Sequence, residues 1–200
     1  MIKKAVITAA GLGIGMLPLT KTQPKEMLPI GSKPCIQYIV EELASVGVKQ
    51  ILMIVGQNDR SIKDHFDKDN GLNDNLGNSE LQGLLKLLDY EALDVQLFYT
   101  RQSSPTGLGD AISQARHFVN KEPFIVALGD SILYSEENHC LLKRMLNFYK
   151  EHESSLVLGA QEVPLEDVSQ YGIIKPKQQG NQSIIEIDYV VEKPPVKTTP

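Results

Sequence analysis

Residues 4–15 read KAVITAAGLGIG, an apolar run that passes directly into three closely spaced glycines. A short β-branched run of this kind predicts a buried strand over Lys4–Thr8 that ends before the glycines. Glycine leaves the backbone N–H groups of the following loop open to a ligand, because no side chain shields them. The segment therefore predicts a strand followed by a nucleotide-binding loop at residues 9–15.

The spacing of these glycines excludes two familiar nucleotide loops. A dinucleotide fingerprint starting at Gly11 needs glycine at position 16, where the chain has Met16. A P-loop needs Gly-Lys followed by Ser or Thr, which is absent here. The loop therefore belongs to a third type.

Strand-like and helix-like segments alternate along the chain. The further strands are expected at 50–55, 95–100, 124–128 and 155–158, and the amphipathic helices at 36–46, 81–88, 111–119 and 141–149. Alternation predicts an α/β fold that is Rossmann-like, with a mainly parallel sheet and helices on both faces. Ligands of such folds bind beyond the carboxyl ends of the strands. Residues 67–79 are expected to form an exposed loop, 172–191 a hairpin, and 194–200 a linker-like segment.

Composition narrows the classes of function. The chain has 200 residues and a formal net charge of −5, so one domain is expected, and nucleic-acid binding through a broad basic surface is disfavoured. No apolar run approaches the roughly 18 residues of a membrane span, and helix breakers argue against a signal peptide at the N-terminus. Cys35 and Cys140 lack metal-site spacing and are expected to be reduced thiols, which favours a cytoplasmic location.

Residues 18–34 read PLTKTQPKEMLPIGSKP and follow the glycine loop directly. Prolines restrict the backbone around Lys21 and Lys25, and these lysines offer cations beside a phosphate cradle. In isolation the segment would be a surface loop with solvated lysines. Next to the glycine loop, phosphate binding explains it better.

The order AGLGxxMLPxTKxxPKEMLPIxxKPxIQY over Ala10–Tyr38 resembles bacterial UTP–glucose-1-phosphate uridylyltransferases, of the sugar nucleotidyltransferase superfamily. The resemblance continues at 62–67, 101–102, 107–112, 128–130, 171–172 and 191–194. It implies one nucleotidyltransferase-like domain over 1–200, with its sugar-binding part near 155–194. Family members continue beyond the motif at 191–194, so this domain is expected to be incomplete at its C-terminus.

The resemblance implies a reaction in which glucose 1-phosphate attacks the α-phosphorus of UTP, giving UDP-glucose and pyrophosphate. Lys25 and Asp130 are the implied catalytic residues, with Asp130 holding Mg²⁺. The implied nucleotide-binding residues are Ala9, Ala10, Gly11, Gly13, Lys25, Gln102 and Gly107, and the implied sugar-phosphate-binding residues are Gly172, Glu192 and Lys193. Without the resemblance, Asp130 would be interpreted as a helix cap or turn residue and Gln102 as a solvent-facing residue.

The chain departs from the family in its glycine loop, where relatives have Gly-Leu-Gly-Thr-Arg and this chain has Ile14 and Gly15. Loss of an arginine that stabilises a phosphoryl-transfer transition state costs on the order of 10³ to 10⁵ in rate. Three hypotheses follow: a uridylyltransferase, a degenerate relative that binds UTP or UDP-sugar and regulates a full-length relative, and a transferase for dTTP or another nucleotide. For the assembly of the chain, two alternatives are expected: a homo-oligomer, or association with a full-length relative.

Overall fold

The computed structural model describes residues 2–57, 60–67, 93–133, 141–152, 154–178 and 184–199. These residues form two compact units, Met1–Ser155 and Leu156–Pro200. The helix expected at 81–88, Cys140 and all of the 67–79 loop beyond Asp67 lie outside the described residues. None of the helices in the described part of the chain has the length and apolar character to cross a membrane.

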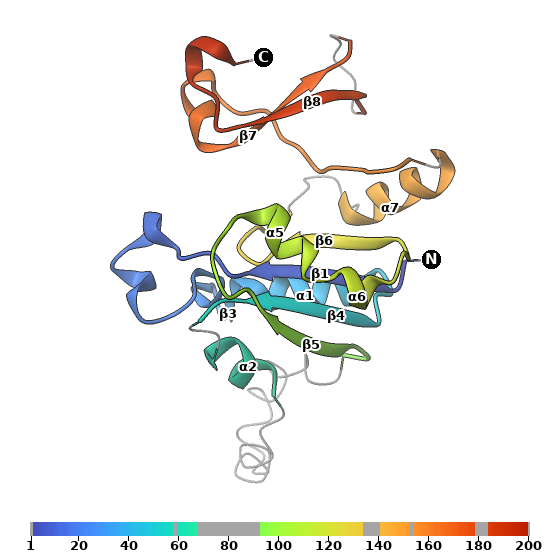
Figure 1. Cartoon of the computed structure of the whole chain (residues 1–200). Helices are drawn as coiled ribbons and strands as arrows, with labels where there is room; N and C mark the ends of the chain where they lie inside the picture. The colour runs from blue at the N-terminus through green and yellow to red at the C-terminus, as the bar shows by residue number, and fades with distance from the viewer. Residues whose placement is uncertain are drawn as a thin grey trace. The chain divides into compact units, whose positions relative to one another are not determined.

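The first unit contains a four-stranded parallel sheet in the order β5-β4-β1-β6 (Figure 1). Its strands are β1 (Lys4–Ala9), β4 (Gln50–Val55), β5 (Gln96–Arg101) and β6 (Phe124–Leu128). Ala5 pairs with Ile51 on one side and with Ile125 on the other. The parallel arrangement confirms the predicted class and brings the carboxyl ends of the strands to one edge.

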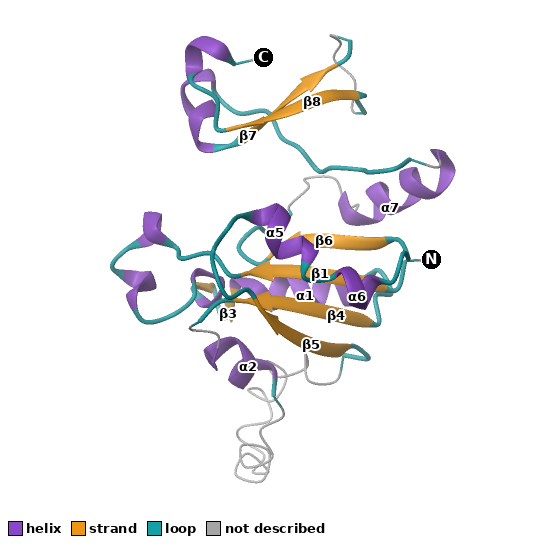
Figure 2. Cartoon of the chain, in the orientation of Figure 1, coloured by secondary structure: helices purple, strands orange, loops and turns teal. Residues whose placement is uncertain are grey.

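Helices cover both faces of this sheet, as the alternation predicted (Figure 2). On one face, α1 (Cys35–Ser45) and α7 (Leu141–His152) contribute Ile36, Leu43 and Leu142 to the core. On the other, α5 (Leu108–Ser113) and α6 (Arg116–Val119) pack around Ala111, Ala115 and Val119. Alternate residues of β1 enter the two cores, which is why this strand is buried throughout its centre.

The helix predicted over 111–119 is two short helices instead. The N–H groups of Gln114 and Ala115 donate to carbonyls three residues earlier, at 3.1 and 3.0 Å. These tighter bonds break the regular helix between α5 and α6.

Short elements connect β1 to α1. They are the 3₁₀ helices η1 (Ile14–Met16), η2 (Leu19–Lys21) and η3 (Lys25–Met27), followed by a hairpin of β2 (Pro29–Ile30) and β3 (Lys33–Pro34). After β4 comes α2 (Arg60–Phe66), whose Ile62 is buried in the same core as α1.

The second unit is built on the antiparallel hairpin of β7 (Gly172–Pro176) and β8 (Ile187–Glu192), which confirms that prediction. It also contains the 3₁₀ helices η6 (Leu165–Gln170) and η7 (Val196–Thr198). The strand predicted over 155–158 is wrong. Those residues pair with no described strand, and Leu156 is 70% exposed, so the apolar run is not matched by burial.

Candidate nucleotide-binding site

Three of the segments singled out in the sequence lie along the carboxyl edge of the parallel sheet (Figure 1). Ala9 ends β1, and Ala10 and Gly11 follow it. Gln102 follows β5, and its backbone N–H donates to the Val55 carbonyl at 3.0 Å. Asp130 follows β6, where the Gly129 N–H donates to the Thr8 carbonyl at 2.9 Å.

Lys25 and Asp130 form an ion pair at this edge, between Nζ and Oδ2. Their side chains remain partly open to solvent, with exposed fractions of 23% and 31%. A Cβ built on Gly11 would lie 3.1 Å from Lys25 Cε and 3.4 Å from Nζ, so Lys25 lies over the glycine loop. The structure therefore brings Gly11, Lys25 and Asp130 together.

This cluster fits a magnesium ion that is shared with a substrate. Within the described ranges, no three His, Cys, Asp or Glu side chains gather into a metal-holding group. Mg²⁺ nevertheless commonly uses one or two carboxylates together with water and substrate phosphates. The partly exposed carboxylate of Asp130 can supply one such oxygen ligand, with water and substrate phosphates supplying the others.

Glu26 lies directly behind the cluster and was not singled out from the sequence. Its side chain is 1% exposed, and Oε2 has no hydrogen-bond partner among the residues described here. Burial raises the pKa of this carboxyl, and the neighbouring Asp130 adds to the effect while Lys25 opposes it. A Cβ on Gly129 would lie 2.8 Å from Glu26 Cγ, so glycine is needed at that position for packing.

The glycine loop is shaped around Gly13, which has a left-handed φ of 63°. Thr20 Oγ1 donates to the Gly13 carbonyl at 2.6 Å, and a Cβ on Gly13 would lie 2.9 Å from Thr20 Cγ2. Beyond this contact the loop is open: Ile14 is 69% exposed, and a Cβ on Gly15 would meet no atom of the described residues within 4 Å. The departures from the family motif therefore lie where a longer side chain has room.

Gln102 lies in a polar cluster rather than in solvent, with an exposed fraction of 6%. Its Nε2 donates to Asp110 Oδ2 at 2.7 Å and to the Gly107 carbonyl at 3.3 Å. Thr106 Oγ1 also donates to Asp110 Oδ2, at 2.6 Å. The hydrogen bonds from Thr106 and Gln102 lower the pKa of the Asp110 carboxyl. The interpretation of Gln102 as solvent-facing when taken alone is therefore wrong.

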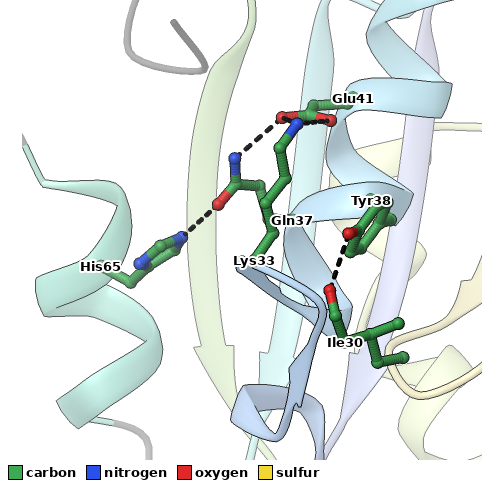
Figure 3. A network of polar contacts seen from close by, with 6 residues as sticks. All are labelled: Ile30, Lys33, Gln37, Tyr38, Glu41 and His65. Atoms are coloured by element: carbon green, nitrogen blue, oxygen red, sulfur yellow. Dashed lines mark hydrogen bonds and ion pairs between the residues drawn. The ribbon is translucent and has the colours of Figure 1, made fainter. Parts of the chain in front are cut away.

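A second polar network holds the segment after Lys25 against α1 (Figure 3). Lys33 Nζ donates to both carboxylate oxygens of Glu41, at 2.8 and 2.9 Å. Gln37 Nε2 donates to Glu41 at 2.8 Å, and its Oε1 lies 3.0 Å from His65 Nε2, which must donate because this oxygen can only accept. Lys33 begins β3, so the network supports the hairpin that follows η3.

The predicted sugar-phosphate residues lie together in the second unit. Gly172 is paired in register with Glu192, and a Cβ on Gly172 would lie 3.2 Å from Glu192 Oε2. Lys193 follows directly, and its N–H donates to the Tyr171 carbonyl at 3.0 Å. The hairpin thus gathers Gly172, Glu192 and Lys193.

Comparison with known proteins identifies the family. The model of the nucleotidyl transferase family matches residues 4–199, across both compact units. The chain belongs to the nucleotidyl transferase family. The nucleotidyltransferase-type Rossmann-like fold expected from the sequence is thereby confirmed.

Relatives of this nucleotidyl transferase agree with the resemblance seen in the sequence. UTP–glucose-1-phosphate uridylyltransferase 2 of Streptococcus pyogenes serotype M1 is 44% identical over 201 aligned residues, which cover 100% of this chain and 67% of the relative. A crystal structure of UDP-glucose pyrophosphorylase complexed with UDP-glucose matches with a TM-score of 0.85 and 38% identity, covering 100% of this chain and 72% of that one. UTP-bound UGPase from Acinetobacter baumannii matches with a TM-score of 0.86 and 33% identity, covering 100% and 70%.

The structure adds residues to the site of this nucleotidyl transferase that sequence reasoning did not select. Glu26 lay inside the quoted motif, but a single sequence does not show that its carboxyl is buried. Asp110 and Thr106 follow Gln102 at spacings of eight and four residues. In the sequence, the polar residues on either side of Gly107 were the only feature that could have indicated a polar cluster around Gln102.

Proposed function

We propose that this chain transfers the uridylyl group of UTP to glucose 1-phosphate, giving UDP-glucose and pyrophosphate. The observation that carries the proposal is the Lys25–Asp130 pair beside Gly11 at the carboxyl edge of the sheet. Relatives named as uridylyltransferases, and solved relatives described with UTP and with UDP-glucose, support the choice of substrates.

In the proposed reaction, a phosphate oxygen of glucose 1-phosphate bonds to the α-phosphorus of UTP while the bond from that phosphorus to the pyrophosphate oxygen breaks. Such a transfer depends on positioning and on neutralising negative charge. Lys25 supplies a cation beside the α-phosphate, and the backbone N–H groups of the loop at 9–15 face the phosphates. Asp130 would hold Mg²⁺, which when bound neutralises phosphate charge and polarises the phosphoryl oxygens.

The remaining site residues are assigned to recognition in this proposal. Ala9, Ala10, Gly11 and Gly13 line the nucleotide, while Gln102 and Gly107 meet the uracil edge. The burial of Gln102 and its contact with Gly107 support this assignment. Gly172 gives the sugar a close approach to the backbone, Glu192 accepts hydrogen bonds from sugar hydroxyls, and Lys193 pairs with the sugar phosphate.

A second function is favoured by one observation, the presence of Ile14 and Gly15 where the family has Thr and Arg. A chain without those two groups binds UTP or UDP-sugar through the remaining residues but turns it over slowly or not at all. In that case it has a regulatory role. It associates with a full-length relative or with copies of itself.

The test mixes the protein with Mg²⁺, UTP and glucose 1-phosphate and measures pyrophosphate release, with UTP binding measured in parallel. Release that is lost in Lys25→Ala supports the transferase. The matched control is Lys49→Ala, because Lys49 Nζ also forms an ion pair, with Asp94 at 2.6 Å, but at the amino ends of β4 and β5. UTP binding without pyrophosphate release supports the regulatory function, and absence of UTP binding contradicts both.

A further inference from the structure

The side-chain amide of Gln102 is held in one orientation by its neighbours. Its nitrogen faces Asp110 Oδ2 at 2.7 Å and the Gly107 carbonyl at 3.3 Å. Both partners are acceptors, since Asp110 is an ionised carboxylate and a carbonyl has no proton to donate. The reversed amide would place its oxygen against these two oxygens and would lose both hydrogen bonds.

Thr106 bonds the same carboxylate oxygen of Asp110 as Gln102 does. Its hydroxyl donates to Asp110 Oδ2 at 2.6 Å, so this oxygen receives one hydrogen bond from Thr106 and one from Gln102. Within the described residues, the carboxylate makes no recorded bond to the backbone of its own helix, α5. A helix-capping role therefore does not account for it.

This orientation leaves Oε1 as the free end of the amide. The recorded hydrogen bonds of the side chain, in the described part of the chain, all involve Nε2 and none involves Oε1. An amide oxygen that is not already bonded can accept a hydrogen bond from a ring N–H. Uracil has such a donor at N3, whereas cytosine has a lone pair at N3 that an oxygen repels.

We propose that Asp110 and Thr106 are positioning residues that select a uracil base over cytosine by locking the Gln102 amide with its oxygen toward the base. The inference rests on the proposed contact of Gln102 with the uracil edge. It goes further, because the discrimination comes from residues that do not themselves touch the base.

The test measures the affinities of UTP and CTP, each with Mg²⁺, by calorimetry and compares their ratio between variants. Asp110→Asn keeps the size of the side chain but supplies an N–H group that can face the reversed Gln102 amide. We expect the preference for UTP over CTP to fall roughly tenfold, because the mismatch at N3 is no longer enforced. Thr106→Val should lower the same ratio by about threefold, since Asp110 remains but is less firmly held.

Asp94→Asn is the matched control, because Asp94 is also an exposed carboxylate whose pKa is lowered by a hydrogen bond, from Lys49. It should leave the ratio unchanged. If Asp110→Asn weakens UTP and CTP binding in parallel, or leaves both unchanged, Asp110 is not a selector and the inference fails.

Gln102→Ala separates this failure from a failure of the proposed function. If Gln102→Ala leaves UTP affinity unchanged, the uracil edge does not meet Gln102 and the assignment beneath the inference is wrong. If Gln102→Ala weakens UTP binding while Asp110→Asn keeps the UTP-to-CTP ratio, only the positioning role is overturned.

Discussion

The proposed base end and the proposed phosphate end of the candidate site are built in different ways. At the proposed base end, Gln102 is buried and bonded to Gly107 and Asp110. At the phosphate end, the loop exposes Ile14, and Gly15 has open space around it. Hydrogen bonds thus hold Gln102 in place at the proposed base end, whereas the proposed phosphate end has the Lys25–Asp130 ion pair beside an open loop.

This difference separates recognition from chemistry. A pre-formed polar cluster supports selective binding, because little ordering is needed when the base arrives. The proposed transfer of the uridylyl group instead needs charge placed around the phosphates, and the glycine loop of this chain has Ile14 and Gly15 where the resemblance implies Thr and Arg. Changes at the two ends should therefore affect different measurements.

The largest expected effect follows removal of the carboxylate at the phosphate end. Asp130→Ala should lower pyrophosphate release by about 10³-fold, because Lewis-acid stabilisation by a metal ion is worth several kcal/mol. The UTP-to-CTP affinity ratio should not change. Asp94→Ala is the control, because Asp94 lies at the amino ends of the strands in the same sheet. It should leave pyrophosphate release unchanged. An Asp130→Ala protein with wild-type turnover would show that the metal binds elsewhere.

The next effect is a gain of rate from restoring the family residues. Gly15→Arg combined with Ile14→Thr should raise pyrophosphate release by roughly 10²-fold, part of the 10³ to 10⁵ that such an arginine can supply. The absence of any atom within 4 Å of a Cβ at position 15 leaves room for the side chain. Single-turnover kinetics would measure the rate.

Turnover that stays at background in this double variant, while UTP still binds, would contradict the idea that the loop limits the reaction. Gly15→Ala with Ile14→Val is the control, because alanine adds only a Cβ at position 15 and valine has the shape of threonine without its hydroxyl. It should leave the rate near that of the unmodified chain.

A smaller effect on folding stability and UTP binding is expected from alanine substitutions at the base end. Two glycines there differ in backbone conformation. Gly107 has φ of 110°, so Gly107→Ala should cost about 1–3 kcal/mol of folding or binding free energy. Gly109 lies within α5 with open space beside it, so Gly109→Ala should instead stabilise by about 0.5–1 kcal/mol. Thermal melting and UTP titration would measure both, and equal effects would contradict the argument from φ.

The sequence predicted most of the first unit because its strands are short apolar runs with clear boundaries. The carboxyl-edge position of the glycine loop and Asp130 followed from the parallel sheet, whereas Gln102 was selected only through the resemblance. The strand expected over 155–158 failed because apolar character alone does not supply a pairing partner, and the described structure leaves Leu156 exposed.

The details of the site depended on contacts between residues far apart in the chain, or on burial. Lys25 and Asp130 are 105 residues apart, and only the fold shows that their charged atoms meet. Glu26 looks like a solvated charge in a Lys-Glu sequence, yet the fold buries it behind Gly129. Local spacing could not reveal that Asp110 contacts the amide nitrogen of Gln102, nor that the amide oxygen has no hydrogen bond among the described residues.

The smallest expected effect is a pH dependence of folding stability. It arises from His65, near the proposed phosphate end, and not from Asp110, at the proposed base end. Burial lowers the pKa of His65 from its ordinary value of 6.5. This residue bonds to Gln37 in the polar network that holds the segment after Lys25 against α1. As pH falls below 6.5, the unfolded chain takes up a proton before folded His65 does, so folding stability decreases. The pKa of Asp110 is shifted below 3.8, so that carboxylate stays ionised and keeps Gln102 oriented.

Urea unfolding between about pH 7.5 and 5.5 should therefore show a decline that His65→Gln reduces, amounting to a small fraction of the roughly 5–15 kcal/mol typical of a domain. His152→Gln, at the exposed end of α7, is the control and should leave the decline in place. The UTP-to-CTP ratio should stay constant over the same range, because the charge on Asp110 does not change. A UTP-to-CTP ratio that falls together with folding stability would mean that protonation of His65 also disturbs the base end. It would contradict the idea that the two ends are held by independent networks.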